Sequence, residues 1–342
     1  MRSLPVLLAA LALAPAAAQT GDVPADLASP EVVVQAAYEA IEREPGDGYD
    51  WDRWDSLFLD RAALVPNPEQ SGGKLSVYSP AEFQWVVDAR TAVGGPRDRG
   101  FQEEQTHAVV HRYGDVAQVT SAYRKHVWDD DEILGRGINA FQLVRQPDGA
   151  WKIASIVWDE EVGAGPIPAR YGGTGGDTEA EVVSAPPSER FATPGAVVDA
   201  AYAVIQRPPG ERHDWDLFRS LFLPQGVMIP NVEQTGGQFT ALSPAGFANW
   251  IDRSTPYGTP QDRGVAEEEV HRVVEQYGDV AQVFSTYQKR FWDSDQVLGR
   301  GINSFQLVRH DGRWWIVGVA WDEEYPSPDH GGGPIPARYL GE

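Results

Sequence analysis

Residues 135–145 have the sequence Gly-Arg-Gly-Ile-Asn-Ala-Phe-Gln-Leu-Val-Arg, and residues 299–309 repeat it with one substitution. Each copy is followed by an Asp-Gly pair, Asp148-Gly149 in the first copy, and then by a second apolar run that begins with tryptophan. Two alternating apolar runs joined by Asp-Gly are typical of a β-hairpin. Because side chains alternate along a strand, Asn139 points to the same face as Phe141. The hairpin is therefore predicted to present a large apolar face that carries one amide.

The repeat extends over most of the 342-residue chain at one constant offset, so that Tyr38 corresponds to Tyr202. Residues 113–119 recur unchanged at 277–283, and each copy ends in Pro-Ile-Pro-Ala-Arg-Tyr. A period of this length indicates duplicated domains, because solenoid repeats span only about 20–50 residues. The stretch between the copies is rich in Gly, Pro, Ser, Thr and Glu, which is typical of a flexible linker. We therefore predict a first domain over residues 29–171, a linker over 172–190 and a second domain over 191–342.

Three helix-start signals precede the strands in the first copy. Ser29-Pro30-Glu31 combines an N-cap with proline and an acid in the first turn, and Ser79-Pro80-Ala81-Glu82 has the spacing of a capping box. Asp50 is predicted to cap a short helix between them. Strands are predicted over residues 101–112 and 115–128, ahead of the hairpin. Three helices packed on a strongly curved antiparallel sheet make each domain a cone-shaped α+β barrel.

The formal net charge of the chain is −22, and its acidic residues are spread over both copies. Such a surface repels phosphate backbones and anionic lipids, so binding to nucleic acid or to a membrane surface is not expected. The sequence contains no cysteine, no His-Glu-x-x-His motif and no Gly-rich phosphate loop between a strand and a helix. We therefore expect no metal site and no cofactor, and a cysteine nucleophile is excluded.

The N-terminus has the features of a secretory signal peptide. Arg2 precedes an apolar run over residues 4–14, which is followed by Pro15 and three alanines. The run is about half of the roughly 20 residues that a transmembrane helix needs. Small residues before Gln19 suit cleavage after Ala18. The sequence predicts a signal peptide over residues 1–18 and a periplasmic or secreted protein whose apolar cores hold the fold without disulfides.

The order of these motifs resembles the nuclear transport factor 2-like superfamily, which includes ketosteroid isomerase, scytalone dehydratase and SnoaL-like cyclases. The resemblance rests on Asp50-Trp51-Asp52, on the Gly-Asp-Val-Ala strand at residues 114–117 and on residues 139–158, with the same elements in the second copy. It covers nearly all of both copies and implies the cone-shaped α+β fold. It does not imply one reaction, because the superfamily combines isomerases, dehydratases, hydrolases and binding modules.

Carried over residue by residue, the resemblance places polar side chains in the cone. The helix-one tyrosine of ketosteroid isomerase corresponds to Tyr38 and Tyr202. Its two carboxyl groups fall close to amides, which are Asn67 and Asn139 in the first copy and Asn231 and Asn303 in the second. An amide takes up no proton near neutral pH, so enolisation by that route needs another base. Scytalone dehydratase has an asparagine on the hairpin strand, as here, and histidines that correspond loosely to His107 and His271.

His107 and His271 are the candidate catalytic residues, because they are the only histidines shared by the copies and a pKa of about 6.5 suits acid–base chemistry. The alternative is a structural histidine on a partly apolar strand face. The candidate ligand-binding residues are polar or aromatic and recur in both copies: Tyr38, Trp51, Asn67, Asn139 and Phe141, with Tyr202, Trp215, Asn231, Asn303 and Phe305. The asparagines have structural alternatives, in which each ties down a loop or a turn. Further candidate walls of the first cavity are Leu57, Phe58 and Trp85, and Arg300 is expected to pair with Asp322 or Glu323.

Three functions are consistent with this sequence. The leading hypothesis is an exported protein that holds a small, mostly apolar molecule in a cone-shaped cavity in each domain. The second is a cofactor-independent lyase or isomerase in which His107 or His271 is the base while tyrosine and asparagine polarise the substrate. The third is a structural scaffold whose cavities are filled by side chains. The outer faces of the hairpin strands are expected to pack on each other, which would make the chain an intramolecular pseudo-dimer.

Overall fold

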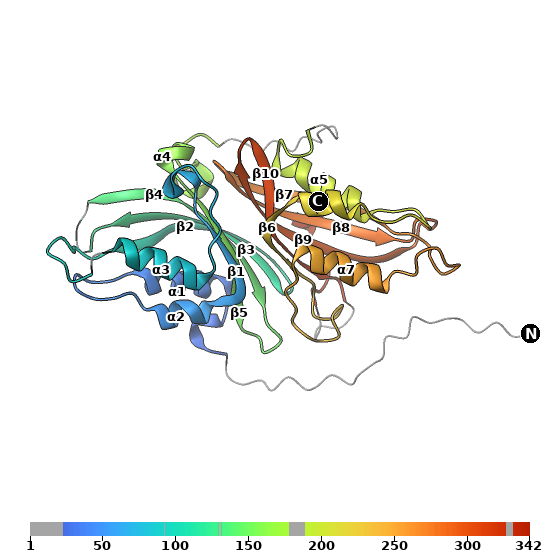
Figure 1. Cartoon of the computed structure of the whole chain (residues 1–342), viewed down its shortest axis with the longest axis horizontal. Coiled ribbons are helices and arrows are strands. Elements are labelled where there is room, and N and C mark those ends of the chain that lie inside the picture. Colours follow the sequence, from blue (N-terminus) through green and yellow to red (C-terminus); the bar gives the residue numbers. More distant parts are fainter. Residues whose placement is uncertain (1–22, 92, 129, 131, 178–188, 326–330) are drawn as a thin grey trace, which may run out of the picture.

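The computed structural model describes residues 23–91, 93–128, 130, 132–177, 189–325 and 331–342. Two α+β domains lie side by side, each with its helices on one side of a curved sheet (Figure 1). The predicted signal peptide lies outside the described residues, as does most of the predicted linker. Within the described ranges, no helix is long and apolar enough to cross a membrane.

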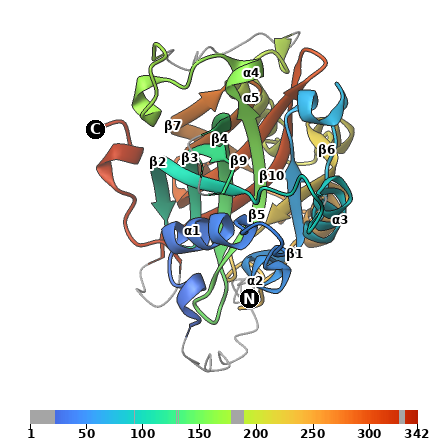
Figure 2. The ribbon, with the colours of Figure 1, turned by 90° about the vertical axis from the view of Figure 1, so that its left-hand side faces the viewer.

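The first domain combines three covering helices with a five-stranded sheet. The helices are α1 (Pro30–Ile41), α2 (Trp51–Leu57) and α3 (Pro80–Arg90). The strands are β1 (Phe58–Val65), β2 (Gln102–Tyr113), β3 (Val116–His126), β4 (Ile133–Arg145) and β5 (Trp151–Glu160), followed by the short helix α4 (Glu161–Ala164). Short 3-10 helices occur at η1 (Ala25–Leu27), η2 (Pro68–Ser71) and η3 (Ala169–Tyr171). Figure 2 views this domain end on, with α1 and α2 in front of the strands.

The second domain repeats the arrangement. Its covering helices are α5 (Pro194–Ile205), α6 (Trp215–Ser220) and α7 (Pro244–Ser254). Its strands are β6 (Phe222–Ile229), β7 (Ala266–Tyr277), β8 (Val280–Arg290), β9 (Val297–His310) and β10 (Arg313–Glu323), and the 3-10 helix η5 (Ala337–Tyr339) follows them. The β4–β5 and β9–β10 pairs are the antiparallel hairpins that the Asp-Gly turns predict.

The predicted helix starts are confirmed by their hydrogen bonds. Ser29 accepts from the backbone of Val32, and Asp50 accepts from the backbone of Arg53. Ser79 and Glu82 form a complete capping box at the start of α3. These caps satisfy backbone N–H groups that a helix leaves without partners, which fixes where each helix begins.

Each sheet is mixed rather than purely antiparallel. The strand orders are β1-β5-β4-β3-β2 and β6-β10-β9-β8-β7, and both edge strands β1 and β6 run parallel to their neighbours. The four strands that follow α3 are joined in sequence by short turns and are antiparallel, as predicted. The strand β1 is separated from β5 by α3 and three strands, so no hairpin turn imposes an antiparallel direction on the pair. Phe58 directly follows α2 and begins β1.

The sheet faces that the helices leave uncovered pack against each other through four buried glutamines at equivalent positions. Gln118 donates to the carbonyl oxygen of Phe305 at 2.9 Å, and Gln282 donates to that of Phe141 at 2.7 Å. Gln142 and Gln306 make the corresponding bonds to carbonyl oxygens in the opposite sheet. The four residues are at most 1% exposed, and the side-chain nitrogen of each donates a hydrogen bond across the interface.

Each domain also closes a turn of the other domain. The carboxylate of Asp322 accepts a hydrogen bond from the backbone of Asp115 at 2.8 Å, and Asp159 accepts one from the backbone of Asp279 at 2.8 Å. The glycine before each of these turn aspartates has a positive φ, and a Cβ atom at either glycine would overlap the facing carboxylate. We call these two contacts the turn clasps. They give a physical reason for the identity of residues 113–119 and 277–283.

The pairing expected for Arg300 is wrong. Arg300 forms a bidentate ion pair with Glu324, in which Nε and Nη2 donate to the two carboxylate oxygens at 2.8 and 3.0 Å. The carboxylate of Asp322 is occupied by two backbone N–H groups, one from Asp115 and one from Glu323. The carboxylate of Asp322 thus accepts hydrogen bonds from the backbone, including that of a turn, rather than pairing with Arg300.

Equivalent positions of the two domains also meet directly. His111 and Glu275 are 164 residues apart in the chain, and His111 Nε2 lies 3.0 Å from Glu275 Oε1. Tyr171 donates to the other oxygen of Glu275 at 2.5 Å. One member of this pair is a histidine and the other is a glutamate, so the contact depends on a difference between the two domains at equivalent positions.

Candidate functional site

A cavity lies between the helices and the sheet in each domain. Its volume is about 570 Å³ in the first domain and about 380 Å³ in the second. The first cavity has mainly apolar walls, which include Ala37, Trp54, Phe83, Phe141, Ile156 and Trp158. Its polar lining residues include Tyr38, Glu103, Tyr123, Lys125, Asn139 and Glu160. Concave, mostly apolar sites of this size with a few placed polar groups are typical of small-molecule binding.

A hydrogen-bonded cluster joins α1 to the sheet in the first cavity. Tyr38 OH lies 2.7 Å from Ser121 Oγ. The amide of Asn139 donates to Tyr38 OH and to Glu103 Oε1, both at 3.0 Å. Ser121 and Asn139 are paired neighbours on β3 and β4, so the sheet register places them together under α1. Burial raises the pKa of Tyr38 above its usual value, so the phenol stays neutral.

Glu103 is the titratable group of this cluster. Its burial raises its pKa to about 7, and the hydrogen bond from Asn139 and the charge of Lys125 only partly oppose this effect. The carboxylates of Glu160 and Glu42 add to the increase. Lys125 itself contacts Glu160 at 2.5 Å. Glu103 therefore exchanges a proton close to neutral pH, which is the range that general acid–base chemistry requires.

The second cavity contains the equivalent cluster. Tyr202 OH lies 2.7 Å from Ser285 Oγ, and Asn303 donates to Tyr202 OH at 3.0 Å. Burial raises the pKa of Glu267 to about 7, as for Glu103. The smaller volume has one visible cause, because Trp250 lines this cavity at the position that Val86 occupies in the first.

The second cavity also carries a neutral histidine that the first cavity lacks. His213, which corresponds to Tyr49, lies with Nδ1 2.8 Å from Tyr257 OH and Nε2 3.2 Å from the carbonyl oxygen of Ile205. Burial lowers the pKa of His213 to about 4. Its ring stacks on Trp215 with 4.5 Å between centroids, and this stacking is consistent with a packing role.

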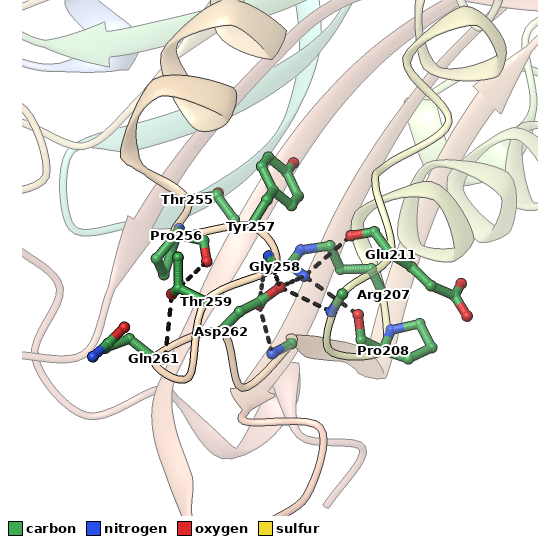
Figure 3. A network of polar contacts seen from close by, with 12 residues as sticks. Arg207, Pro208, Glu211, Thr255, Pro256, Tyr257, Gly258, Thr259, Gln261 and Asp262 are labelled. Atoms are coloured by element: carbon green, nitrogen blue, oxygen red, sulfur yellow. Dashed lines mark hydrogen bonds and ion pairs between the residues drawn. The ribbon is translucent and has the colours of Figure 1, made fainter.

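A buried ion pair fixes the loops beside each cavity. Asp262 accepts from both terminal nitrogens of Arg207, at 3.1 and 2.7 Å, and from the backbone of Gly210 at 2.9 Å (Figure 3). The hydrogen bonds from Arg207 hold the pKa of Asp262 well below its usual range. Arg43 and Asp98 form the same pair in the first domain. Arg207 and Asp262 line the second cavity, but they are bound to each other and to the loops. We therefore assign this pair to the scaffold of the cavity.

The structure distributes the predicted ligand-binding residues between the cavities and the surrounding scaffold. The residues in the cavity walls are Tyr38, Asn139 and Phe141 in the first domain and Tyr202, Asn303 and Phe305 in the second. Trp51 and Trp215 are placed elsewhere, since their ring N–H groups donate to Asp88 and Asp252 and so join the second helix to the third. Asn67 donates to Asp159 at 3.0 Å, and Asn231 donates to Tyr325 OH at 3.0 Å. These four residues hold elements together and are outside the described walls of the cavities.

Three further wall assignments are wrong in the first cavity. Trp85 is 72% exposed on the outer side of α3. Leu57 and Phe58 are buried in the core beneath α2 and are not among the described lining residues. Trp54, one turn before Leu57, takes the place in the wall. Of the buried apolar residues of α2, the cavity wall therefore includes Trp54 but not Leu57.

The two candidate histidines do not reach the described walls of the cavities. A β-bulge between Gln105 and His107 shifts the register of β2, and β7 has the same bulge between Glu269 and His271. The inserted residue reverses the alternation of side chains, so Glu103 lines the cavity and Gln105 reaches Ser121 on the same side of the sheet, whereas His107 faces the other side. His107 is exposed. It lies beside Gly172, and His271 lies beside Gly341.

Sequence reasoning missed Glu103 and Glu267 as site residues. A usable signal was present, because an acid recurs at this position in both copies four residues before each shared histidine. The bulge hid the assignment, since strict alternation would place Glu103 and His107 on the same face. Among the described residues, no group of histidine, aspartate and glutamate side chains is arranged to hold a metal ion.

Comparisons with known proteins identify relatives in structure only. No family model and no curated protein matches the chain. A protein with a cystatin-like fold from Nostoc punctiforme PCC 73102 is 9% identical, with 39% of this chain and 89% of that chain covered and a TM-score of 0.31. An NTF2-like protein of unknown function from Silicibacter pomeroyi DSS-3 is 16% identical, with 41% and 100% covered and a TM-score of 0.28. An NTF2-like protein of unknown function from Shewanella baltica OS155 is 15% identical, with 38% and 90% covered and a TM-score of 0.28.

The arrangement of elements within this chain decides the fold. Three helices cover a five-stranded, strongly curved sheet, and the same order of elements occurs twice. Each half of the chain is therefore an α+β unit in which three helices cover one side of a curved five-stranded sheet. The prediction of two tandem α+β domains is thus confirmed.

Proposed function

We propose that this protein is exported and that each of its two domains holds a small, mostly apolar molecule in its cavity. The observation that carries the proposal is the pair of cavities, each with apolar walls and one cluster of tyrosine, asparagine and glutamate. A scaffold without a ligand would be expected to fill this space with side chains, because empty apolar volume lowers stability. Export rests on the sequence of residues 1–18 alone.

The ligand suited to these cavities has an apolar body and one small polar group. Aromatic and aliphatic residues would cover the body, while the tyrosine and asparagine would orient the polar group by hydrogen bonds. An anionic ligand is disfavoured, because Glu103 and Glu160 line the first cavity, Glu267 and Glu323 line the second, and the protein as a whole has a net charge of −22.

Exchanging one residue between the cavities tests the proposal. Val86→Trp places in the first cavity the residue that the second cavity already carries at Trp250, so the fold tolerates it. We expect the first site to lose pyrene affinity by about tenfold or more, which is about 1.4 kcal/mol, since the indole takes up apolar space. Fluorescence titration of the full chain with pyrene measures this.

The reciprocal variant Trp250→Val is the matched control and is expected to strengthen pyrene binding at the second site. Unchanged pyrene binding in both variants would remove the cavities as the binding sites.

A second candidate function is a cofactor-independent isomerase or lyase in which Glu103 and Glu267, instead of the histidines, carry the proton. It is favoured by one observation, the pKa of about 7 of both carboxyl groups inside apolar cavities. Such a group can remove a proton from carbon and return it to a neighbouring atom, while the tyrosine and asparagine stabilise the charge that develops.

Deuterium exchange tests this second function. With cyclohexanone in D₂O buffer, the full chain is expected to speed deuterium incorporation next to the carbonyl, as followed by NMR. The double variant Glu103→Gln with Glu267→Gln is expected to return the rate to that of buffer. His107→Ala with His271→Ala serves as the control that keeps the activity. A histidine variant that loses the exchange while the glutamine variant keeps it would contradict this assignment.

We also infer that the two domains act as one intramolecular pseudo-dimer. The turn clasps, the glutamine bonds between the sheets and the contact between His111 and Glu275 support this inference. A homodimer of either domain would bring two histidines or two glutamates together at the last of these contacts, whereas the single chain pairs one of each.

A further inference from the structure

The two cavities differ in one residue that controls the direction of their hydrogen bonds. Gln105 in the first domain corresponds to Glu269 in the second. Gln105 Nε2 donates to Ser121 Oγ at 2.7 Å, whereas Ser285 Oγ donates to Glu269 Oε1 at 2.5 Å. The serine is therefore an acceptor toward β2 in the first domain and a donor toward β7 in the second.

Glu269 lies in an ion cluster that has no counterpart among the described residues of the first domain. Burial raises the pKa of Glu269, whereas its ion pair with Arg272 opposes this effect and favours the carboxylate form. Arg272 contacts both Glu269 and Asp199. The first domain has Ala108 and Gln35 at the positions of Arg272 and Asp199. Three positions thus differ together, and the cluster leaves Glu269 able to accept hydrogen bonds but not to donate them.

In the second domain this fixes the tyrosine proton. The 2.7 Å contact between Tyr202 OH and Ser285 Oγ needs one proton between the two oxygens. The proton of Ser285 is directed to Glu269, so the proton of Tyr202 must lie in this contact. Tyr202 is then a donor to Ser285 and an acceptor from Asn303, with no proton left for a ligand.

In the first domain the same argument gives the opposite result. Ser121 is 0% exposed, and its hydrogen-bond partners among the described residues are Gln105, which donates to it, and Tyr38. The proton of Ser121 can therefore be satisfied only by Tyr38 OH. Tyr38 accepts from Ser121 and from Asn139, which leaves its own proton directed into the cavity that it lines.

We infer that the two cavities take ligands of different chemistry. The first cavity offers the hydroxyl of Tyr38 as a donor and takes a molecule with an acceptor, such as a carbonyl, ether or nitrile group. The second cavity offers Tyr202 only as an acceptor and takes a molecule with a donor, such as an alcohol or an amine. This inference rests on the proposed function of the cavities as ligand sites, and it limits any proton donation by tyrosine to the first domain.

Infrared spectroscopy of bound benzonitrile tests the inference, because the nitrile has one acceptor and its stretching band moves to higher frequency when it accepts a hydrogen bond. The full chain saturated with benzonitrile is expected to show two bands, of which only the higher-frequency band comes from the first cavity. Tyr38→Phe is expected to remove that band. Tyr202→Phe, the matched control, is expected to keep it.

Transplanting the ion cluster provides a second variant. Gln105→Glu combined with Ala108→Arg and Gln35→Asp is expected to remove the higher-frequency band while Tyr38 remains in place. A band that survives Tyr38→Phe, or one that disappears in Tyr202→Phe, would overturn the inference.

A measurement without ligand separates this inference from the proposed function. Neutron diffraction of the deuterated protein locates the hydroxyl deuterons directly. The inference requires the deuteron between Tyr38 and Ser121 to belong to the serine, and the one between Tyr202 and Ser285 to belong to the tyrosine. The same assignment in both domains would overturn it. Failure of benzonitrile to bind would count instead against the cavities as ligand sites.

Discussion

Gly278→Ala is expected to lower the free energy of unfolding by about 3–5 kcal/mol. Gly278 has a φ of 54°, and a Cβ atom there would overlap the carboxylate of Asp159 and lie 2.5 Å from Ala164 Cβ. The left-handed backbone costs an alanine about 1–2 kcal/mol. Displacing Asp159 also breaks its hydrogen bond to the backbone of Asp279, and a bond to a charged group contributes about 1.5–3 kcal/mol. Urea denaturation of the full chain measures the sum.

The matched control is Gly312→Ala, in the hairpin turn of the second domain. Gly312 has a φ of 74°, but an added Cβ would meet nothing within 4 Å. It should therefore show the backbone cost of about 1–2 kcal/mol alone. In the double variant Gly278→Ala with Asp159→Ala, the overlap with the carboxylate is absent and only the contact with Ala164 remains, so the loss should be smaller than the sum of the losses in the two single variants. Equal losses at Gly278 and Gly312 would show that the turn clasp contributes nothing to stability.

The sequence-based prediction was accurate where the signal is local. The hairpin follows from two alternating runs and an Asp-Gly turn, and Asp311 and Gly312 do adopt the positive φ values of such a turn. The capping box at Ser79 and Glu82 is likewise specified by residues three apart. The duplication repeats the same pattern in the second half of the chain, which is why the order of helices and strands could be predicted for both domains.

The site was less predictable because it depends on register. The bulges in β2 and β7 insert a residue that no local pattern marks, and they exchange the faces of Glu103 and His107. The sequence indicates a short strand at residues 64–67, but not its parallel direction in β1, since that direction depends on pairing with residues more than 90 positions later. Asp159 is next to the cavity residue Glu160 in the sequence, but its carboxylate accepts a hydrogen bond from a turn of the other domain, at Asp279. Contacts of this kind are visible only after the chain is folded.

The protein is expected to be more stable near pH 5 than near pH 8, and carboxyl groups with raised pKa values are the reason. Burial raises the pKa values of Glu103, Glu267 and Asp322 to about 7. Between about pH 4 and pH 7 the folded chain therefore keeps protons that the unfolded chain has lost. Stability contributed by these protons is complete at the lower limit and is lost as pH rises through about 7. At 1.36 kcal/mol per pKa unit, each glutamate accounts for about 3 kcal/mol.

Carboxyl groups with lowered pKa values have the opposite effect, because they lower the free energy of unfolding at acid pH. Hydrogen bonds from Arg43 and Arg207 hold the pKa values of Asp98 and Asp262 below their usual range. Their contribution is present above the unfolded pKa of about 4 and is lost as pH falls below it. The two opposing sets of groups therefore place the maximum close to pH 4, near the carboxyl pKa values of the unfolded chain, and urea denaturation from pH 3 to pH 8 locates it.

Glu103→Gln isolates the contribution of one cavity group. Glutamine keeps the shape of the side chain and cannot ionise, so the variant should gain about 2–3 kcal/mol over the parent protein at pH 8 and little at pH 5. Glu104→Gln removes the same formal charge from the neighbouring residue, whose side chain pairs with Arg124 and lies outside the cavity wall. This control separates burial of a charge from general repulsion in an acidic protein, because both variants change the net charge equally. A pH dependence that is the same in the two variants would mean that the Glu103 carboxyl is solvated like a surface group, and the acid–base role proposed for the cavity would lose its physical basis.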